Sequence, residues 1–589
     1  METAKRTARV RRTAAGPSGR VRADARRDGD RRLTLAGLLR AVAAAVPERT
    51  ALIGGGVRTT YADLDARADR LAAHLAASGA APGARTAILS RNRVEWLEAF
   101  FGVLRAGAVP VNLNQRYIRA ELEQVLDDSG STALIAERSH AARLLEPGPR
   151  PPQLRHTVLL DDGTPPAAWE SRAGAGPGVT DYTRALAATG PAPDRAAEPD
   201  SADDALYLLY TGGTTGQPKG VLWRQADLFR AALEWRGRGH PRASSPEEVA
   251  QRARDRAPRR LLVLGPLMHA AGQWNALSVL FAGGTVVLCT DPAFDAQRVV
   301  DLAEAERVHA VQVVGDTMAR PLADRLAQQP GRCPDLAALT SGGTPLTPAV
   351  RRMWREWRPE VAIKDSYGGS ETGVCGATGG AGAAGFAMGA SVAVLDENLR
   401  PLPPGSERVG RIARTGRIPL GYYNDPEATA RTFPVGPDGR RWVLSGDYGT
   451  VAEDGAVTLL GRGSAVVNTG GEKVFAEEVE SVVKSHPGVA DAIVVGAPDE
   501  VLGRRVTAIV SAAAEGAPDA EELQTHCRRH LAGFKVPRTV HFVDHVRRTA
   551  VGKQDYRWAA DLVSARSPDG PPAGGGEASP QGRSSVSNR

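Results

Sequence analysis

The chain has 589 residues, too many for one compact core, so we expect a large domain, itself subdivided, and at least one smaller domain. Hydrophobic residues make up 42% and charged residues 24%, which is ordinary for a soluble globular protein. The net charge of +7 lies in residues 1–32, which hold 11 Lys or Arg and four acidic residues, so the remainder is formally neutral. A basic arm without aromatic residues is typical of a disordered extension, and this distribution argues against nucleic-acid binding.

The cysteines and the apolar stretches favour a cytoplasmic protein. The four cysteines are widely spaced without a CxxC pair, so neither a zinc site nor a disulfide framework is expected. Leu33–Val46 follows basic residues, but Arg40 interrupts it and Pro47 follows in place of a small-residue cleavage site. We therefore expect an amphipathic first helix. No apolar run of about 18 residues predicts a transmembrane segment.

Strand and helix patterns alternate after this helix. Arg85–Ser90 is predicted as a buried strand, Trp96–Ala106 as a helix and Gly107–Asn112 as the next strand. This rhythm predicts an α/β fold, in which a large N-terminal domain has mainly parallel sheets covered by helices. Residues 146–199, with short ordered pieces such as His156–Leu160, and a polar insertion at 236–259 are expected to be surface connections.

Beyond about Gly463 the pattern changes to short α+β units. Ala476–Ser485 is predicted as a helix, and Val489–Gly496 and Arg505–Ala512 as strands, so we expect a small mobile C-terminal domain. The last residues are rich in Gly, Pro and Ser, which is typical of a disordered tail. The expected parts are the basic arm 1–32, the large domain 33–462, the small domain 463–560 with its core at 478–553, and the tail 561–589.

The most informative segment is Leu208–Val221, where apolar residues lead into a glycine- and threonine-rich loop. Glycine lets backbone approach a polyanion, threonine offers hydroxyl donors, and lysine offers a charge. Pro218 precedes the lysine and Gly220 follows it, so the spacing is not that of a Walker A loop. The alternative is a flexible turn. The candidate phosphate-binding residues are Thr211, Gly212, Gly213, Thr214, Thr215 and Lys219.

Tyr210–Gly220 resembles the phosphate-binding signature of the adenylate-forming superfamily, which includes acyl-CoA synthetases, luciferases and the adenylation domains of peptide synthetases. Further segments resemble the superfamily in its order. Ser341–Leu346 resembles the segment that lies against adenine, through Gly342, Gly343 and Thr344. Asp365–Gly373 resembles the Tyr-Gly-x-Thr/Ser-Glu motif, which read alone is a glycine-rich turn.

The resemblance gives the motif residues their roles. It implies that Tyr367 stacks on adenine, Asp365 accepts from the adenine amino group, Ser370 holds the α-phosphate and Glu371 ligates Mg²⁺.

The ribose is expected at Ser445–Tyr448, where Asp447 accepts from the ribose hydroxyls and Arg462 makes a second contact. Without the resemblance, Asp447 in Ser-Gly-Asp would be interpreted as a turn residue.

Two segments of the small domain complete the resemblance. Thr469–Glu480 resembles the loop that packs against the pantetheine arm of coenzyme A, through Gly470, Gly471 and Lys473. Arg548–Tyr556 carries the C-terminal lysine motif, which implies that Lys553 bridges the attacking carboxylate and the α-phosphate. Without the motif, a lysine near a C-terminus would be interpreted as a solvent-exposed surface residue.

His269 lies in Gly265–Trp274, which resembles the border of the acyl pocket. The resemblance implies that His269 lines the acid carboxylate or gates the thiol; the alternative is a packed histidine.

Gly380–Gly385 satisfies GxGxxG, but no strand precedes it, so we interpret it as a mobile loop.

The resemblance covers about residues 33–560 and is strongest to actinobacterial-type fatty-acid and steroid side-chain acyl-CoA synthetases. It implies ATP, Mg²⁺ and coenzyme A as cofactor or substrates, with a medium-chain, long-chain or bulky polycyclic carboxylic acid. The hinge position, usually Asp or Lys, is Ser464, and Ala476 replaces a frequent Pro. Two alternatives stay open: an enzyme that stops at the adenylate or loads a carrier protein, and a nucleotide-binding protein without turnover.

Overall fold

The structure is a computed structural model. It describes residues 33–146, 151–167, 178–187, 205–211, 218–234, 241–343, 346–378, 385–469, 472–499, 502–513, 516–549 and 554–566. Of Arg462, Ser464, Asn468, Glu472, Lys473 and Gly503 it describes the backbone alone.

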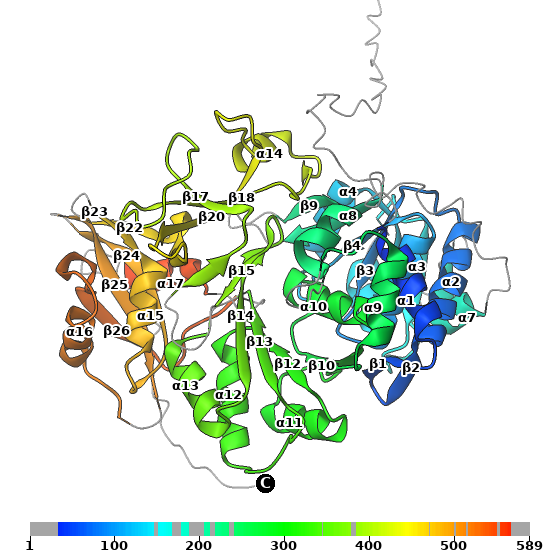
Figure 1. The fold of residues 1–589 in the computed structure, drawn as a ribbon, viewed down its shortest axis with the longest axis horizontal. Coiled ribbons are helices and arrows are strands. Elements are labelled where there is room, and N and C mark those ends of the chain that lie inside the picture. Colours follow the sequence, from blue (N-terminus) through cyan, green and yellow to red (C-terminus); the bar gives the residue numbers. More distant parts are fainter. Residues whose placement is uncertain are drawn as a thin grey trace, which may run out of the picture.

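An eight-stranded sheet forms the first half of the large domain, in the order β19-β9-β8-β4-β3-β5-β6-β7 (Figure 1). The six strands β8, β4, β3, β5, β6 and β7 are parallel, whereas β9 is antiparallel to β8 and β19 is antiparallel to β9. The predicted βαβ unit is confirmed, since α3 connects the parallel strands β3 and β4. The strands are β3 (Arg85–Leu89), β4 (Val109–Asn112), β5 (Ser131–Glu137), β6 (His156–Leu160), β7 (Val179–Asp181), β8 (Leu206–Thr211), β9 (Lys219–Arg224) and β19 (Gly421–Tyr422).

A 13-stranded sheet forms the second half, in the order β17-β18-β20-β21-β16-β15-β14-β13-β12-β10-β11-β1-β2. The run from β14 to β1 is parallel, as expected, but the run from β14 to β17 is antiparallel, so the sheet is mixed. The strands are β1 (Thr50–Gly54), β2 (Val57–Thr60), β10 (Arg260–Val263), β11 (Thr285–Leu288), β12 (Ala310–Val313), β13 (Ala338–Gly342), β14 (Ala362–Gly369), β15 (Gly373–Thr378), β16 (Phe386–Met388), β17 (Val392–Leu395), β18 (Gly410–Thr415), β20 (Trp442–Val451) and β21 (Val457–Arg462).

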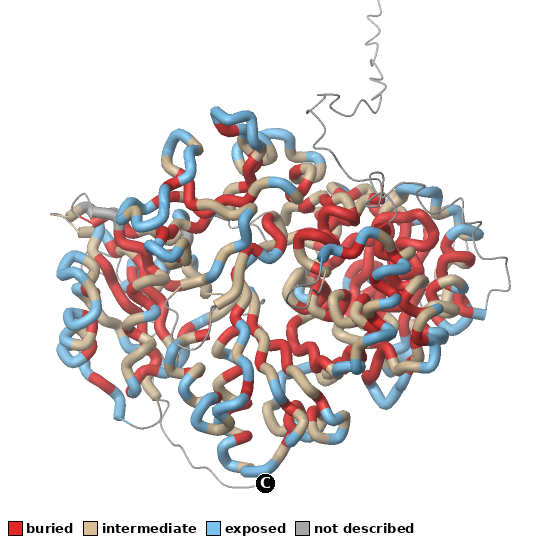
Figure 2. Tube along the Cα trace, in the orientation of Figure 1, coloured by how far each residue is buried: buried red, intermediate tan, exposed pale blue. Residues whose placement is uncertain are grey.

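Helices and sheets alternate in layers. The largest core joins the inner faces of both sheets to α1, α2, α3 and α10, while α4 and α5 cover the outer face of the smaller sheet and α11, α12 and α13 cover that of the larger (Figures 1 and 2). The helices are α1 (Leu35–Ala45), α2 (Tyr61–Ala77), α3 (Val94–Arg105), α4 (Arg119–Ser129), α5 (Arg138–Leu145), α7 (Tyr182–Leu186), α8 (Gln225–Leu228), the π-helix η4 (Phe229–Leu233), α9 (Pro246–Asp255), α10 (Ala270–Phe281), α11 (Ala296–Ala305), α12 (Asp316–Ala327), α13 (Pro348–Trp357) and α14 (Pro426–Thr432).

The first helix is confirmed, and a helix occupies part of the segment expected as a polar insertion. Thr34 caps α1 by accepting from the amide of Gly37, and the buried side of α1 packs on α9. In α9, Pro246, Val249, Ala250 and Ala253 are buried although the other residues of the helix are polar. A few small apolar residues give a weak helical signal in a polar segment.

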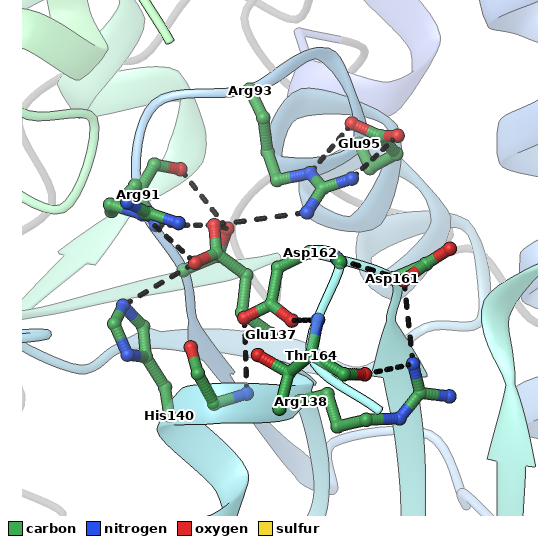
Figure 3. A network of polar contacts seen from close by, with 12 residues as sticks. Arg91, Arg93, Glu95, Glu137, Arg138, His140, Asp161, Asp162 and Thr164 are labelled. Atoms are coloured by element: carbon green, nitrogen blue, oxygen red, sulfur yellow. Dashed lines mark hydrogen bonds and ion pairs between the residues drawn. The ribbon is translucent and has the colours of Figure 1, made fainter. Parts of the chain in front are cut away.

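A buried carboxylate joins the carboxyl ends of β3 and β5 (Figure 3). Glu137 accepts from the Ser90 hydroxyl (2.9 Å) and from the Arg91 amide and Nε (3.1 Å each), and His140 Nε2 lies 3.4 Å away. In open α/β sheets ligands often bind where the strand order reverses, as it does between β3 and β5. Here ion pairs and hydrogen bonds occupy that position, while the predicted phosphate loop follows β8, which runs parallel to β4 and ends at the same carboxyl edge of the sheet.

The C-terminal part has sheets and a core of its own (Figure 1). The predicted helix and both strands are present as α15, β24 and β25. The rings of Tyr448 and Phe475, 5.6 Å apart, connect β20 to this part. Its elements are the 3₁₀ turn η5 (Gly463–Ala465), β22 (Val466–Thr469), β23 (Glu472–Phe475), α15 (Ala476–Lys484), β24 (Val489–Asp499), β25 (Gly503–Ala512), α16 (Ala520–Arg528), the 3₁₀ turn η6 (Gly533–Lys535), β26 (Thr539–Phe542) and α17 (Tyr556–Ala565). Within the residues that the structure describes, no helix combines the length and the hydropathy needed to cross a membrane.

Candidate active site

The predicted phosphate loop joins two antiparallel strands. Thr211 at the end of β8 pairs with Lys219 at the start of β9, so these two residues form the base of the loop. Asn112 holds the preceding residue, since its Oδ1 accepts from the Tyr210 amide (2.7 Å) and its Nδ2 donates to the Tyr210 carbonyl (3.0 Å). Gly212, Gly213, Thr214 and Thr215 lie outside the described residues, so their role stays a prediction.

Lys219 lines a cleft of about 590 Å³ that runs along α4. Its Nζ is 3.3 Å from Asp425 Oδ2 and 5.2 Å from the centre of the Tyr422 ring. Because the Asp425 carboxylate that pairs with this ammonium is partly exposed to solvent, the pair is weakened and a polyphosphate can compete for the lysine. The cleft is lined by Ala120, Glu123, Gln124, Asp127, Asp128, Pro218, Lys219, Tyr423 and Asp425.

Tyr422 connects Lys219 to Glu371. Strand β19 pairs with β9, and the Tyr422 hydroxyl donates to Glu371 Oε1 at 3.0 Å. Burial, followed by the Glu371 carboxylate, raises the pKa of Tyr422. The hydroxyl therefore stays protonated and orients the carboxylate that the sequence predicts as a Mg²⁺ ligand.

Buried side chains hold the carbonyl groups of the Ser370-Glu371 motif. Trp223 Nε1 donates to the Ser370 carbonyl at 2.8 Å. Arg414 Nη1 donates to the carbonyls of Thr372 (2.6 Å) and Val374 (2.9 Å). Sequence analysis missed Arg414, because no local pattern distinguishes a buried arginine in a strand from an exposed one.

The predicted adenine and ribose residues lie together. The Tyr367 hydroxyl donates to Asp447 Oδ2 at 2.6 Å and lies 3.1 Å from Ser445 Oγ. Burial, and then the Asp447 carboxylate, raise the pKa of Tyr367 well above its usual value. Asp447 and Arg462 are paired across β20 and β21, so both predicted ribose contacts come from neighbouring strand positions.

Asp365 has protein partners that the sequence did not indicate. Its Oδ2 accepts from Arg351 Nη2 (2.6 Å) and from the Leu346 amide (3.0 Å). Burial raises the pKa of Asp365 to about 6, against the opposing effects of these two donors. The predicted contact with the adenine amino group thus has to be made by a carboxylate that already bonds to arginine.

The glycines predicted beside adenine border the segment that contains His269. A Cβ at Gly342 would lie 3.9 Å from the Cβ of Ala271, two residues after His269. Gly343 has φ +93°, which disfavours any residue with a side chain. His269 is the N-cap residue of α10, and its carbonyl accepts from the Gln273 amide at 3.0 Å. Thr344 and most of the Gly380–Gly385 loop lie outside the described residues.

The structure describes fewer of the functional residues that the sequence predicts in the C-terminal part. Gly470, Gly471 and Lys553 lie outside the described residues, and Lys473 is described by its backbone, which pairs with Asn468 in the β22–β23 hairpin. Ser464, at the expected hinge, lies in η5 between β21 and β22, and Ala476 begins α15. The roles of all these residues stay predictions.

The site thus combines a lysine at the base of a strand–loop–strand turn, a Tyr–Glu contact between the two sheets and a Tyr–Asp pair within the larger sheet, as in enzymes that adenylate a substrate. The protein belongs to the AMP-binding enzyme family, whose sequence model matches residues 39–423, and the C-terminal domain model of the same enzymes matches residues 478–553.

Its relatives include CoA ligases of actinobacteria. It is 40% identical over 558 residues to a 3-oxocholest-4-en-26-oate–CoA ligase of Rhodococcus rhodochrous, covering 91% of this chain and 97% of the relative. It is 39% identical over 554 residues to a medium/long-chain-fatty-acid–CoA/3-oxocholest-4-en-26-oate–CoA ligase of Mycobacterium tuberculosis, covering 92% and 98%. The fold is similar to that of ATP-bound MatB from Rhodopseudomonas palustris, with a TM-score of 0.72, 27% identity, and coverage of 90% and 98%.

Proposed function

We propose that this protein is an AMP-forming acyl-CoA synthetase that activates a carboxylic acid with ATP and transfers the acyl group to coenzyme A. The observation that carries the proposal is that Tyr422 contacts both Lys219, over its ring, and Glu371, at its hydroxyl, near the base of the phosphate loop. This gives the site both a cation for phosphate and a carboxylate for a divalent metal. Family membership and the named activities of the relatives support the same reaction.

In the first step the carboxylate of the acid attacks the α-phosphorus of ATP, and pyrophosphate leaves. Lys219 binds the phosphates, and Lys553 neutralises charge that develops between the carboxylate and the α-phosphate. Asp447 and Arg462 hold the ribose, and Tyr367 packs on adenine. In the second step the thiol of coenzyme A attacks the acyl-adenylate and AMP leaves, with the loop that contains Gly470, Gly471 and Lys473 lining the approach after the small domain turns about Ser464.

The donor set around Glu371 fits Mg²⁺. Magnesium prefers oxygen ligands and commonly binds through one or two carboxylates together with substrate phosphates. Across the described ranges, no group of three His, Cys, Asp or Glu side chains could hold a metal without the substrate. Glu371 would hold the ion, which would supply positive charge to the phosphates.

The acid is proposed from likeness alone: a medium-chain, long-chain or bulky polycyclic carboxylate such as a steroid side chain. The cytoplasm is the proposed compartment, which agrees with four cysteines that are all unbridged.

Three measurements test the function. Carboxylate-dependent exchange of labelled pyrophosphate into ATP must occur, which separates an enzyme from a nucleotide-binding protein without turnover. Product analysis must show an acyl-thioester only when coenzyme A is present; adenylate alone under both conditions would favour a carrier-loading ligase. Lys553→Gln must abolish adenylate formation, and unchanged adenylation would overturn the mechanism. A panel of fatty, aromatic and steroid acids, followed by AMP release, then identifies the substrate class.

A further inference from the structure

The chain on either side of residues 550–553 is held by two carboxylates of the small domain. Arg548 and Gln554 pair in an isolated antiparallel bridge, so the described chain before and after this segment lies side by side. Asp491, on β24, binds Arg548: Nη2 lies 2.6 Å from Oδ1 and Nε lies 2.9 Å from Oδ2. Glu480, on α15, binds Gln554, which directly follows Lys553 in the sequence.

Glu480 is a buried carboxylate with uncharged hydrogen-bond donors. The residue is 2% exposed, and its Oε2 accepts from Gln554 Nε2. Its Oε1 accepts from the Val494 amide (2.8 Å) and from the Tyr556 hydroxyl (3.1 Å). Two of these three donors belong to the residues just after Lys553.

Burial of this carboxylate is unfavourable for folding. A buried carboxylate is destabilising unless its partners compensate, and a hydrophobic residue of similar volume is often neutral or better. Burial has the largest effect on the pKa of Glu480; Lys484, one turn further along α15, opposes it and Glu477 adds to it, and the pKa is raised to about 7. A carboxylate that is buried despite this unfavourable free energy, with a strongly raised pKa, is a candidate for a functional role.

We propose that Glu480 is a positioning residue for adenylation, which acts by fixing Gln554 and Tyr556 and so the chain position from which Lys553 works. This inference rests on the proposed function of Lys553. In that mechanism Lys553 serves adenylation alone, and the Gly470-Gly471 loop serves thioester formation. Loss of the Glu480 contacts should therefore slow the first half-reaction and spare the second.

The test compares both half-reactions in Gln554→Leu, which keeps the approximate size of the side chain and removes the amide donor. Pyrophosphate exchange is expected to fall at least about tenfold in rate, because small misplacements of a catalytic group have effects of this size or larger. Thioester formation from preformed acyl-adenylate and coenzyme A is expected to stay within about twofold of wild type. Tyr556→Phe removes the second donor to Glu480. It should also slow pyrophosphate exchange, by a smaller factor, and leave thioester formation unchanged. This variant tests the proposal if Gln554→Leu does not fold.

Glu478→Gln is the matched control. Glu478 lies two residues before Glu480 on α15, is partly exposed, and pairs with Lys535 at 2.7 Å. Its loss should leave both half-reactions unchanged. If Lys553→Gln abolishes pyrophosphate exchange while Gln554→Leu and Tyr556→Phe leave its rate unchanged, the positioning role is overturned and the proposed function stays intact. An equal loss in both half-reactions would show a merely structural role and would also overturn it.

Discussion

The hydroxyl of Tyr422 lies 3.0 Å from Oε1 of Glu371, although the two residues are 51 positions apart in the sequence. The contact exists because β19 adds to the edge of the smaller sheet beside β9, while Glu371 follows β14 of the larger sheet. One hydrogen bond thus connects the two halves of the large domain at the proposed metal ligand. Lys219 lies over the ring of the same tyrosine, so Tyr422 positions both groups.

Tyr422→Phe should weaken the handling of Mg-ATP without unfolding the protein. The change removes a hydrogen bond to a carboxylate, which corresponds to about a tenfold loss in kcat/KM for ATP. Pyrophosphate exchange at varied ATP and Mg²⁺ measures it. Tyr182→Phe is the matched control, because it removes another tyrosine–carboxylate bond, from Tyr182 to Glu98 (2.8 Å), in α7. A loss of equal size in both variants would contradict a specific role for Tyr422.

Asp365 should make stability depend on pH in a defined window. Its pKa is raised to about 6 by burial, so the folded state binds this proton more tightly than the unfolded state, whose carboxyl has a pKa near 3.9. The contribution of Asp365 to stability is therefore greatest below about pH 4 and is lost as pH rises to about 6, by roughly 2–3 kcal/mol.

The measurement is the difference in unfolding free energy between wild type and Asp365→Asn from pH 4 to pH 7. The wild type should lose stability relative to the variant across this window. Asp454→Asn, at an exposed hairpin turn, is the control and should show no such trend. A difference that is flat with pH would contradict the raised pKa of Asp365.

Local patterns predicted the parts of this protein that depend on short stretches of chain. The parallel unit from β3 to β4 follows from an apolar strand, a largely apolar helix and a second strand that are consecutive in the chain. The phosphate loop and the Tyr367 motif are similarly local, since glycine, hydroxyl and charged residues stand together in sequence. Such signals are set by backbone conformation and by periodicity, which a sequence displays directly.

The contacts that fix the site were not predictable from the same patterns. Arg351 reaches Asp365 from α13, and Arg414 reaches Thr372 from β18, and only the tertiary fold brings these elements together. Tyr422 lies in β19, a segment to which the sequence analysis gave no role. A charged or aromatic residue carries no local sign of which distant group it will contact.

Arg414 should be required for the geometry of the Ser370-Glu371 motif. It is 6% exposed, and its Nη1 donates to carbonyls of Thr372 and Val374, while the Ala231 carbonyl in the π-helix η4 lies 3.4 Å away. Arg414→Met leaves these carbonyls without a shared donor, so adenylation should fall by about tenfold or more. Arg414→Lys, which can still donate, should recover part of the rate.

Arg358→Met is the control for Arg414, because Arg358 likewise donates to backbone carbonyls, of Cys333 (2.9 Å) and Leu336 (3.2 Å), but at the end of α13. Both variants should lose thermal stability, and Arg414→Met alone should lose adenylation. If the two variants differ from wild type only in melting temperature, Arg414 has no effect on the motif beyond folding.

Gly373 should not tolerate a side chain, for two separable reasons. Its φ is +70°, a region that residues with a Cβ rarely adopt. A Cβ there would also lie 2.9 Å from Arg414 Nη1 and 3.1 Å from the Ala231 carbonyl. Gly373→Ala should therefore destabilise the protein by about 2–6 kcal/mol, since backbone strain and overpacking each contribute about 1–3 kcal/mol, and should lower adenylation by displacing Arg414.

Gly439→Ala separates the two contributions. Gly439 has φ +76°, but no atom of the described residues lies within 4 Å of the position that an alanine methyl group would take. This variant therefore carries the backbone strain without the contacts, and its destabilisation should be about 1 kcal/mol, with adenylation unchanged. The comparison needs denaturant unfolding for stability and pyrophosphate exchange for activity. Equal destabilisation in the two variants would mean that η4 yields to the methyl group, and the close approach of Arg414 and Ala231 would then not constrain the motif.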